Sequence, residues 1–355
     1  MNTISLVTYH YSANAGAVMQ TYALCRFLKE HGFKIEVVDI RHFEPTLKTI
    51  SEGSPLPIRL LKSIIYPRRM KKIMTQYYPA VTKHYKSMEE LRKDPPKSDC
   101  YIVGSDQVWN PDISADRALA YFLDFGSDEV LRISYASSFG LSKWKAGKYA
   151  STAIVKKCLD KFNSVSVREL EGAEILRKTF NIEPTIVVDP TFLNDNYPEI
   201  TGKVIQRKEI VCYKLEKTPD FWENMPIVSK KMNTPVLLLN YNYPKKGYKY
   251  HFNPTVKQWV GRIAGAYFVV TDSFHGVAFS IIYKREFAAV INHNGKESRI
   301  VSLLKILHLE NRMFDSVKDL SMSNCWDNSI DYTRVYKLLA VQKEISINYL
   351  LNALK

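Results

Sequence analysis

Short apolar runs of strand length alternate with helical patterns along most of the chain, and this alternation constrains the fold more than any other feature. In the first half, strands are expected at residues 4–8, 35–40, 101–103, 132–136, 165–167 and 186–188. Helices are expected between some of them, at residues 17–28, 150–162 and 169–180. Strands that alternate with helices predict a mostly parallel sheet with helices on both faces.

The alternation stops at Asp189 and restarts after a polar segment, residues 194–208, that is typical of a linker. Further strands are expected at residues 210–213, 236–240, 268–270 and 287–291, and further helices at 256–264, 275–282, 298–307 and 332–354. A chain of 355 residues exceeds the usual size of one hydrophobic core. We therefore predict an α/β protein with two Rossmann-like domains facing a cleft, residues 1–200 and 201–355. The last helix is expected to pack back toward the first domain.

The chain is strongly basic, because 50 Lys and Arg against 36 Asp and Glu give a formal net charge of +14. Such an excess favours anionic partners: nucleic acid, an acidic membrane surface, or phosphorylated and carboxylated substrates. The weaker alternative is that the charge only confers solubility. Nucleic acid is not expected as a partner, because the sequence has neither spaced zinc ligands nor an aromatic and basic RNA-binding motif. An anionic, phosphate-bearing substrate is the stronger expectation.

The cysteines and the first residues favour a cytoplasmic location. The five cysteines lie far apart without a Cys-x-x-Cys pair, which argues against a disulfide framework and a structural zinc site. The first residues do not have the pattern of a signal peptide, and the longest apolar stretches, such as residues 236–239, have only strand length. The sequence also has no carboxylate-rich cluster or other metal-binding motif, so no metal is expected.

One segment departs from the alternation. Residues 57–72 mix six basic residues with Ile, Leu and Tyr, which is the pattern of a helix that lies on an anionic bilayer. An ordinary surface helix with a solvated basic face explains the same residues equally well.

Several motifs share one local design, in which an apolar strand runs into a turn of small polar residues before a helix. Ligands bind at such junctions in open parallel sheets. In residues 271–276 (Thr-Asp-Ser-Phe-His-Gly), Asp272 or Ser273 can cap the next helix, which places His275 in its first turn. A histidine there can serve as a general acid or base, and the alternative is an incidental residue of a capped helix.

The segment Ser-Val-Arg-Glu, residues 166–169, offers a second candidate. Ser166 and Glu169 have the spacing of a capping box, which explains both residues structurally. Arg168 is not needed for that cap, and its planar donors suit a phosphate or a carboxylate.

Two further junctions are less distinctive. After Gly104, the side chains of Ser105, Asp106 and Gln107 suit a ligand rich in hydroxyl groups, and a simple polar loop is the equal alternative. Residues 9–17 contain neither a Gly-x-Gly-x-x-Gly motif nor a Walker loop, and the lone His10 at the strand end is typical of a structural residue.

Taken in order, these motifs resemble the polysaccharide pyruvyl transferase family. The resemblance rests on residues 14–20, 104–111, 135–140, 166–169, 188–191 and 271–276, followed by 297–299. It spans most of the chain and implies a fold like the two-Rossmann architecture of glycosyltransferase B enzymes. That fold agrees with the independent pattern of strands and helices.

The resemblance also implies a reaction: transfer of the enolpyruvyl group of phosphoenolpyruvate to a sugar of a surface polysaccharide precursor, as a pyruvate ketal. Carried over by position, the histidine and the arginine of the family motifs are His275 and Arg168. As a hypothesis for the mechanism, we expect His275 to donate the proton and Arg168 with Arg299 to supply cations for the phosphate and carboxylate. We expect substrate contacts from Asn14, Gly16, Ser105, Asp106, Gln107, Asp272 and Ser273. No metal or organic cofactor is implied. Some family members carry an acidic residue where this chain has Ala17, so no residue at this position can take the role of that acid here.

The family's acceptor sugar is often linked to a lipid diphosphate at the inner membrane face. The resemblance therefore suggests an acceptor side in the first domain and a donor side in the second, with peripheral contact to an anionic membrane. The main alternative is a glycosyltransferase of the same fold that uses a nucleotide sugar. A partner protein without activity and a nucleic-acid binder are further alternatives.

Overall fold

The computed structural model describes residues 2–41, 56–216, 218–240, 245–291 and 297–355, with the side chains of 56–65 excluded. These residues form two compact units, which are described separately. Unit 1 comprises Met1–Leu193 and Ile345–Lys355, and unit 2 comprises Asn194–Glu344. The sequence places the domain boundary at residue 200, whereas the units divide at Leu193. Helix α15 (Tyr332–Ala353) begins in unit 2 and ends in unit 1.

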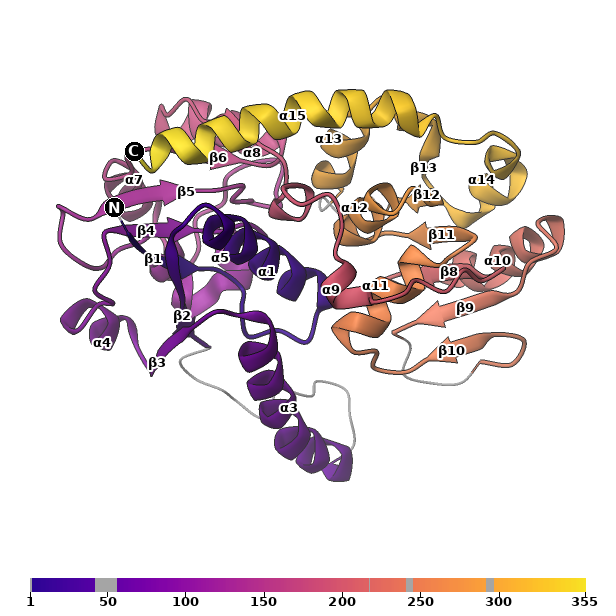
Figure 1. The fold of residues 1–355 in the computed structure, drawn as a ribbon, viewed down its shortest axis with the longest axis horizontal. Helices are drawn as coiled ribbons and strands as arrows, with labels where there is room; N and C mark the ends of the chain where they lie inside the picture. The colour runs from indigo at the N-terminus through magenta and orange to yellow at the C-terminus, as the bar shows by residue number, and fades with distance from the viewer. Residues whose placement is uncertain (1, 42–55, 217, 241–244, 292–296) are drawn as a thin grey trace. The chain divides into compact units, whose positions relative to one another are not determined.

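Unit 1 contains a five-stranded parallel sheet in the order β3-β2-β1-β4-β5 (Figure 1). Its strands are β1 (Thr3–Val7), β2 (Lys34–Ile40), β3 (Val81–Tyr85), β4 (Cys100–Val103) and β5 (Leu131–Ser134), and β6 (Ser166–Val167) pairs with β7 (Thr185–Ile186). Its helices are α1 (Ala15–Glu30), α3 (Leu56–Tyr77), α4 (Met88–Lys93), α5 (Pro111–Ser114), α6 (Ala118–Tyr121), α7 (Thr152–Leu159) and α8 (Leu170–Ile175).

Unit 2 repeats the design with a six-stranded parallel sheet in the order β10-β9-β8-β11-β12-β13 (Figure 1). Its strands are β8 (Ile210–Tyr213), β9 (Val236–Leu239), β10 (Lys249–His251), β11 (Phe268–Thr271), β12 (Glu286–Val290) and β13 (Met313–Phe314). Its other helices are α9 (Pro198–Thr201), α10 (Pro219–Lys231), α11 (Val256–Ala264), α12 (Phe274–Ile282), α13 (Ser298–Ile306) and α14 (Val317–Met322). The expected α/β fold with two parallel-sheet domains is confirmed.

Each sheet carries its own apolar core. In unit 1 the fully buried Trp109 stacks on Phe122 with ring centroids 5.6 Å apart, inside a cluster that includes Val103 and Phe139. In unit 2 the buried strand residue Val270 belongs to a cluster with Phe221 of α10. Burial on both faces explains why the central strands read as continuous apolar runs in the sequence.

The ends of α1 follow the usual stop and start signals. Asn14 is its N-cap, because the side-chain oxygen accepts a hydrogen bond of 2.9 Å from the backbone N–H of Gly16. After the helix the chain turns at Gly32, whose φ of 88° favours glycine. The polar segment 194–208 is not a simple linker, since it contains α9.

The basic segment 57–72 lies within α3, as its helical pattern indicates. Within its described part Met70 is fully buried, whereas Arg68, Lys71 and Lys72 are exposed. None of the helices that the structure describes has the length and apolar character to cross a bilayer.

Candidate active site

The order of the strands marks a binding position in each sheet. In both sheets the order reverses next to the first strand, between β1 and β4 in unit 1 and between β8 and β11 in unit 2. Ligands of open α/β sheets bind in the crevice beyond the carboxyl ends of the strands at such a switch point. The sequence-predicted residues Ser105, Asp106 and Gln107 follow β4, whereas Asp272, Ser273 and His275 follow β11.

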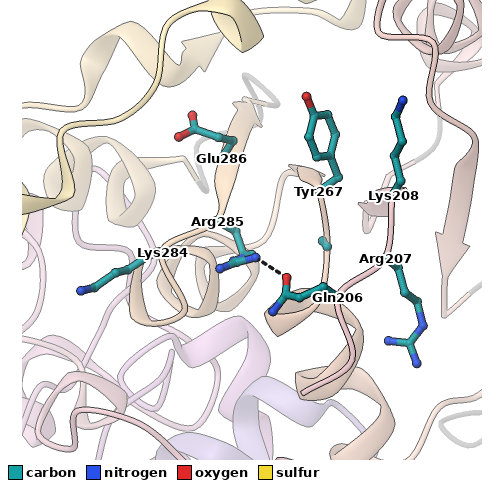
Figure 2. A pocket seen from close by; sticks show the side chains of 8 residues that line it. Gln206, Arg207, Lys208, Tyr267, Lys284, Arg285 and Glu286 are labelled. Carbon is teal, nitrogen blue, oxygen red and sulfur yellow. Dashed lines mark hydrogen bonds between the residues drawn. The ribbon is translucent and has the colours of Figure 1, made fainter. Parts of the chain in front are cut away.

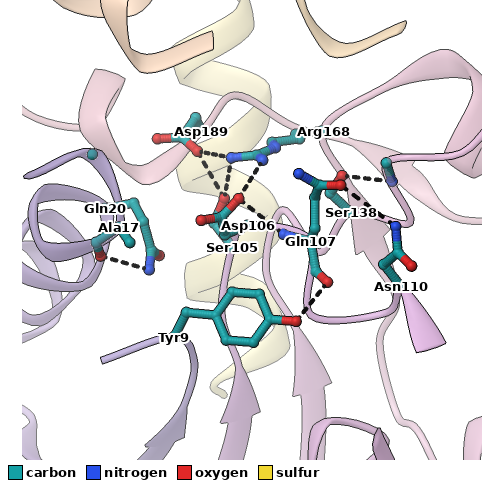
Figure 3. A network of polar contacts seen from close by, with 12 residues as sticks. Tyr9, Ala17, Gln20, Ser105, Asp106, Gln107, Asn110, Ser138, Arg168 and Asp189 are labelled. Carbon is teal, nitrogen blue, oxygen red and sulfur yellow. Dashed lines mark hydrogen bonds and ion pairs between the residues drawn. The ribbon is translucent and has the colours of Figure 1, made fainter. Parts of the chain in front are cut away.

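In unit 1 a buried network converges on Arg168, as Figure 3 shows. Its Nη1 donates to Ser105 Oγ at 3.0 Å and to Asp189 Oδ2 at 2.6 Å, and its Nη2 donates to Asp106 Oδ1 at 3.1 Å. Ser105 Oγ donates to the same oxygen of Asp189 at 2.7 Å, and Thr191 donates through N and Oγ1 to the other. Arg168 therefore joins the strand-end turns of β4, β6 and β7.

The guanidinium of Arg168 is surrounded by carboxylates. Besides Asp189 and Asp106, Glu169 Oε2 lies 3.9 Å from its Nε. Burial lowers the pKa of Arg168, but the carboxylates, Asp189 first, outweigh that effect and raise it. This arrangement holds the loop after β4 in place, and direct contact of Arg168 with a substrate anion stays a prediction.

The capping box predicted for Ser166 and Glu169 is wrong. Ser166 belongs to β6, where its hydroxyl donates to Ser134 O at 2.8 Å, and α8 begins only after Glu169. The fully buried carboxylate of Glu169 instead accepts the backbone N–H of Phe139 at 3.1 Å. The Ser-x-x-Glu spacing arises here because both residues fix the neighbouring turn after β5, which a local helix signal cannot reveal.

Gln107 follows β4 and Asn14 follows β1, at the carboxyl ends of two neighbouring strands. The backbone at Asp106 adopts φ 77°, an unusual conformation for a residue with a side chain, and Tyr9 Oη donates to Gln107 O at 3.0 Å (Figure 3). Such backbone strain is found where the surrounding structure fixes a functional loop. Asn14 and Gly16 form the first turn of α1, which follows β1 on the same edge of the sheet.

His10 has the structural role that the sequence favours. Its Nε2 lies 3.0 Å from Asp39 Oδ1, and the ring is almost fully buried. Arg41 donates to the same carboxylate through Nη2 at 2.6 Å. Burial raises the pKa of Asp39, but the bonds from His10 and Arg41 outweigh it and hold the pKa far below its usual range.

In unit 2 the junction after β11 is built around Thr271 and Gly276. Thr271 Oγ1 donates to Tyr213 O at 2.6 Å and accepts the backbone N–H of Ser273 at 3.1 Å. A Cβ at Gly276 would lie 2.3 Å from that hydroxyl oxygen, so only glycine fits. Ser273 caps α12 by accepting from Gly276 N, as the sequence predicts, and His275 is the second residue of the helix.

Asp272 does not cap the helix. Its two oxygens accept the backbone N–H groups of Leu215 at 2.6 Å and Glu216 at 3.0 Å, and Lys214 Nζ lies 3.3 Å from Oδ2. Asp272 thus ties the turn after β8 to the turn after β11. Both side chains of the Lys214–Asp272 pair are almost completely buried.

His275 and Arg299 occupy the first turns of neighbouring helices. His275 is 5% exposed in the first turn of α12, and Arg299 is the second residue of α13, which follows β12 and contacts α12. The partial positive charge of a helix amino end favours an anion at both positions. The carboxyl ends of β8, β11 and β12 therefore bring Lys214, His275 and Arg299 to one edge of unit 2.

The sequence missed two residues of these clusters as site candidates. Asp189 is the shortest contact of Arg168, yet in the sequence it marked only the end of a strand series and part of a family motif. Lys214 directly follows β8, so the strand-end rule applied to that strand could have found it. The described residues contain no group of three or more His, Cys, Asp and Glu side chains that could hold a metal ion, and independence from metals stays a prediction.

Several solved structures have a similar fold. S. aureus MnaA with UDP is 11% identical, with a TM-score of 0.54 over 99% of this chain and 98% of that one. Arabidopsis thaliana UGT89C1 is 10% identical, with a TM-score of 0.52 over 95% and 93%. The UDP-GlcNAc 2-epimerase of Neisseria meningitidis, bound to UDP-GlcNAc, is 9% identical, with a TM-score of 0.50 over 98% and 100%. At such identity the likeness establishes the glycosyltransferase B type of fold alone.

Sequence comparison identifies the family. No curated protein matches the chain. The profile of the polysaccharide pyruvyl transferase family matches residues 14–294, which include the Arg168 network, Lys214 and His275 but not Arg299. The chain therefore belongs to the polysaccharide pyruvyl transferase family.

Proposed function

We propose that the protein moves the enolpyruvyl group of phosphoenolpyruvate onto two hydroxyls of a sugar in a surface polysaccharide precursor. The observation that carries this proposal is the position of His275. It lies buried in the first turn of α12, at the switch point of the unit 2 sheet, where the structure holds it through Ser273, Thr271 and Gly276. A proton donor at the amino end of a helix suits a substrate that carries a phosphate and a carboxylate.

The reaction needs one proton donor and cations. His275 protonates the methylene carbon of phosphoenolpyruvate, which becomes a methyl group, and the central carbon becomes electrophilic. One sugar hydroxyl adds to that carbon, the bond to the phosphate oxygen breaks, and the second hydroxyl closes the ketal. Of the two hydroxyl protons, one restores the acid and the other leaves with phosphate.

Anion recognition in this scheme belongs to unit 2. Arg299 and the amino ends of α12 and α13 stabilise the phosphate and the carboxylate, and preorganised donors of this kind often make the largest catalytic contribution. Unit 1 binds the acceptor, with Arg168 shaping the loop that presents Ser105, Asp106 and Gln107. Asn14 and Gly16 are proposed to contact the acceptor from the first turn of α1.

The test follows phosphate release and product mass. The purified protein is mixed with phosphoenolpyruvate and a panel of hexosides and lipid-linked sugar mimics. The His275→Gln variant is compared with His308→Gln, which changes an exposed histidine of the same unit. We expect phosphate release together with a product that carries a pyruvate ketal, retained in His308→Gln and reduced roughly 10²-fold or more in His275→Gln.

Two outcomes would overturn this assignment. Equal activity of both variants would remove His275 from the chemistry. Binding of a UDP-sugar without binding of phosphoenolpyruvate would favour a nucleotide-sugar transferase instead. UGT89C1 has been solved in complex with UDP-L-rhamnose, so this alternative has a direct precedent on the same fold.

We also propose a cytoplasmic protein that contacts the inner face of the membrane through the basic part of α3. The exposed Arg68, Lys71 and Lys72 lie on that helix. Binding to anionic vesicles at low salt, lost when these three residues are changed to Gln, would support the contact. Unchanged vesicle binding of that variant would exclude α3 as the contact.

A further inference from the structure

A basic hollow of about 340 Å³ lies at the amino edge of the unit 2 sheet, the side where its parallel strands begin (Figure 2). It is lined by residues that precede β8, β11 and β12 and by the first residue of β12, namely Gln206, Arg207, Lys208, Ala266, Tyr267, Lys284, Arg285 and Glu286. His275 follows β11 at the opposite edge of the same sheet. The four residues of β11, at about 3.3 Å per residue, place roughly 13 Å of strand between the two edges. The hollow is therefore separate from the candidate active site.

The backbone holds the walls of this hollow in place. Arg207 N donates to Gly265 O at 2.8 Å, and a Cβ at Gly265 would lie 2.1 Å from Ile205 O. The segment around Arg207 thus packs backbone to backbone against the end of α11. On the other side, Arg285 N donates to Ser280 O at 2.8 Å, which fixes the turn before β12.

The cations of the hollow are oriented by neutral groups. Arg285 Nε donates to Tyr283 O at 2.8 Å, and its Nη1 donates to Gln206 Oε1 at 2.7 Å, the bond drawn in Figure 2. Lys284 Nζ lies 4.7 Å from the ring centroid of Tyr336. Lys208 is exposed, and Figure 2 shows its side chain extended in the same direction as that of Tyr267.

The described residues place no carboxylate against these cations. None of the ion pairs within the part of the chain that the structure describes includes Arg207, Lys208, Lys284 or Arg285. The one carboxylate of the lining, Glu286, pairs with the buried Arg312 at 3.0 Å and accepts a backbone N–H from residue 330. Four positive charges without a described counter-charge produce a local positive potential that an anion would lower.

The positive surface continues into a second hollow of about 380 Å³, which shares Arg207 with the first. Lys203 and Lys257 line it, and both are exposed. Arg262 also lines it, but Glu209 compensates that charge at 3.1 Å. The pattern is a run of uncompensated cations around two adjacent depressions, rather than evenly scattered surface charge.

We propose that the amino edge of the unit 2 sheet is a second anion site that binds a phosphate group. The fork of Arg285 supplies directed donors, Lys208 and Lys284 supply charge, and the hydroxyl of Tyr267 stands at the rim. The phosphate belongs either to a free phosphate compound or to a lipid headgroup. Both present the same oxyanion to the same donors. This site goes beyond the proposed pyruvyl transfer and does not depend on it.

The experiment locates binding and measures its strength. Hydrogen exchange followed by mass spectrometry, with inorganic phosphate or with vesicles containing phosphatidylglycerol, reports where the backbone becomes protected. Calorimetric titration with phosphate gives the affinity. The test variant is Lys208→Gln with Lys284→Gln. The matched control is Lys230→Gln with Lys318→Gln, which removes two exposed charges elsewhere in unit 2.

We expect protection of residues 203–208 and 284–286, an affinity at least tenfold weaker in the test variant, and less than a twofold change in the control. An Arg285→Lys variant, which keeps the charge and loses the fork, should weaken binding by an intermediate factor. Protection by free phosphate identifies a soluble ligand, and protection by anionic vesicles alone identifies a headgroup. The proposal is overturned if neither probe protects these segments, or if test and control variants lose binding equally.

Discussion

Replacing Arg168 by methionine tests the buried network of unit 1 most directly. The change removes a buried cation that contacts Asp189, Asp106 and Glu169. Asp189 and Glu169 are 1% and 0% exposed, so water cannot compensate for the lost charge. Removing one partner of a buried ion pair typically costs about 3–5 kcal/mol, because the other charge stays buried without compensation.

That cost can be converted into a melting shift. In a unit of this size, each kcal/mol lowers the melting temperature by roughly 2–4 °C, so Arg168→Met should lower that of unit 1 by about 10 °C. Arg168→Lys keeps the charge and should lie between the variant and the wild type. Arg177→Met is the control, because Arg177 pairs with the exposed Glu183 on the surface of the same unit. We expect it to shift the melting temperature by less than about 2 °C.

The pH dependence adds an independent signature. Without the guanidinium, Asp106, Glu169 and Asp189 repel one another, and binding of a proton relieves that repulsion in the folded variant. The folded variant then gains protons that the unfolded chain binds less strongly, so its stability relative to the wild type increases as the pH falls. The deficit of Arg168→Met, measured by scanning calorimetry, should therefore shrink between pH 7.5 and pH 5. A shift no larger than that of Arg177→Met, or a deficit independent of pH, would refute the reasoning.

Three further predictions concern other parts of the chain. Gly276→Ala should lower the melting temperature and the rate of the proposed pyruvyl transfer, whereas Gly261→Ala should not, since a Cβ at Gly261 meets no atom within 4 Å. Equal effects would contradict this account of the turn. Burial raises the pKa of Asp39, but its hydrogen bonds with His10 and Arg41 outweigh burial, so the pKa is lowered overall. Stability from Asp39 should therefore be present above pH 4 and lost below it, and Asp39→Asn should flatten this part of a pH titration of the melting temperature. Burial raises the pKa of the Cys25 thiol to about 12, so a thiol reagent at pH 8 should modify Cys25 only after unfolding, as peptide mapping would show.

The sequence predicts best where local and tertiary preferences agree. β8 and α11 begin and end at the predicted residues, since β8 is continuously apolar and buried, and Thr255 and Gln258 form a capping box at the start of α11. It fails at the sheet edges. β3 and β10 carry polar, partly exposed residues and have no apolar run to mark them.

The candidate site shows the same division. The position of His275 follows from local rules, because a strand, a capping Ser273 and a helix are consecutive in the chain. The ion pairs of Arg168 do not follow from local rules. Its carboxylate partner Asp189 lies 21 residues away in the sequence, and its partner Asp106 lies 62 residues away. Only the folded sheet brings these turns together, so a local motif could not distinguish a substrate cation from a structural one.

Helix α15 has a consequence for the order of events during synthesis. Although the five-stranded sheet of unit 1 is complete early in the chain, Ser346 Oγ accepts the backbone N–H of Val188 at 2.9 Å and Tyr349 Oη donates to Ser134 O at 2.8 Å. These partners emerge from the ribosome only after all of unit 2 has been translated. Domains otherwise fold in order from the amino terminus. Unit 1 is therefore the first to start folding and the last to finish, and a chain that stops at residue 344 leaves it without its closing contacts.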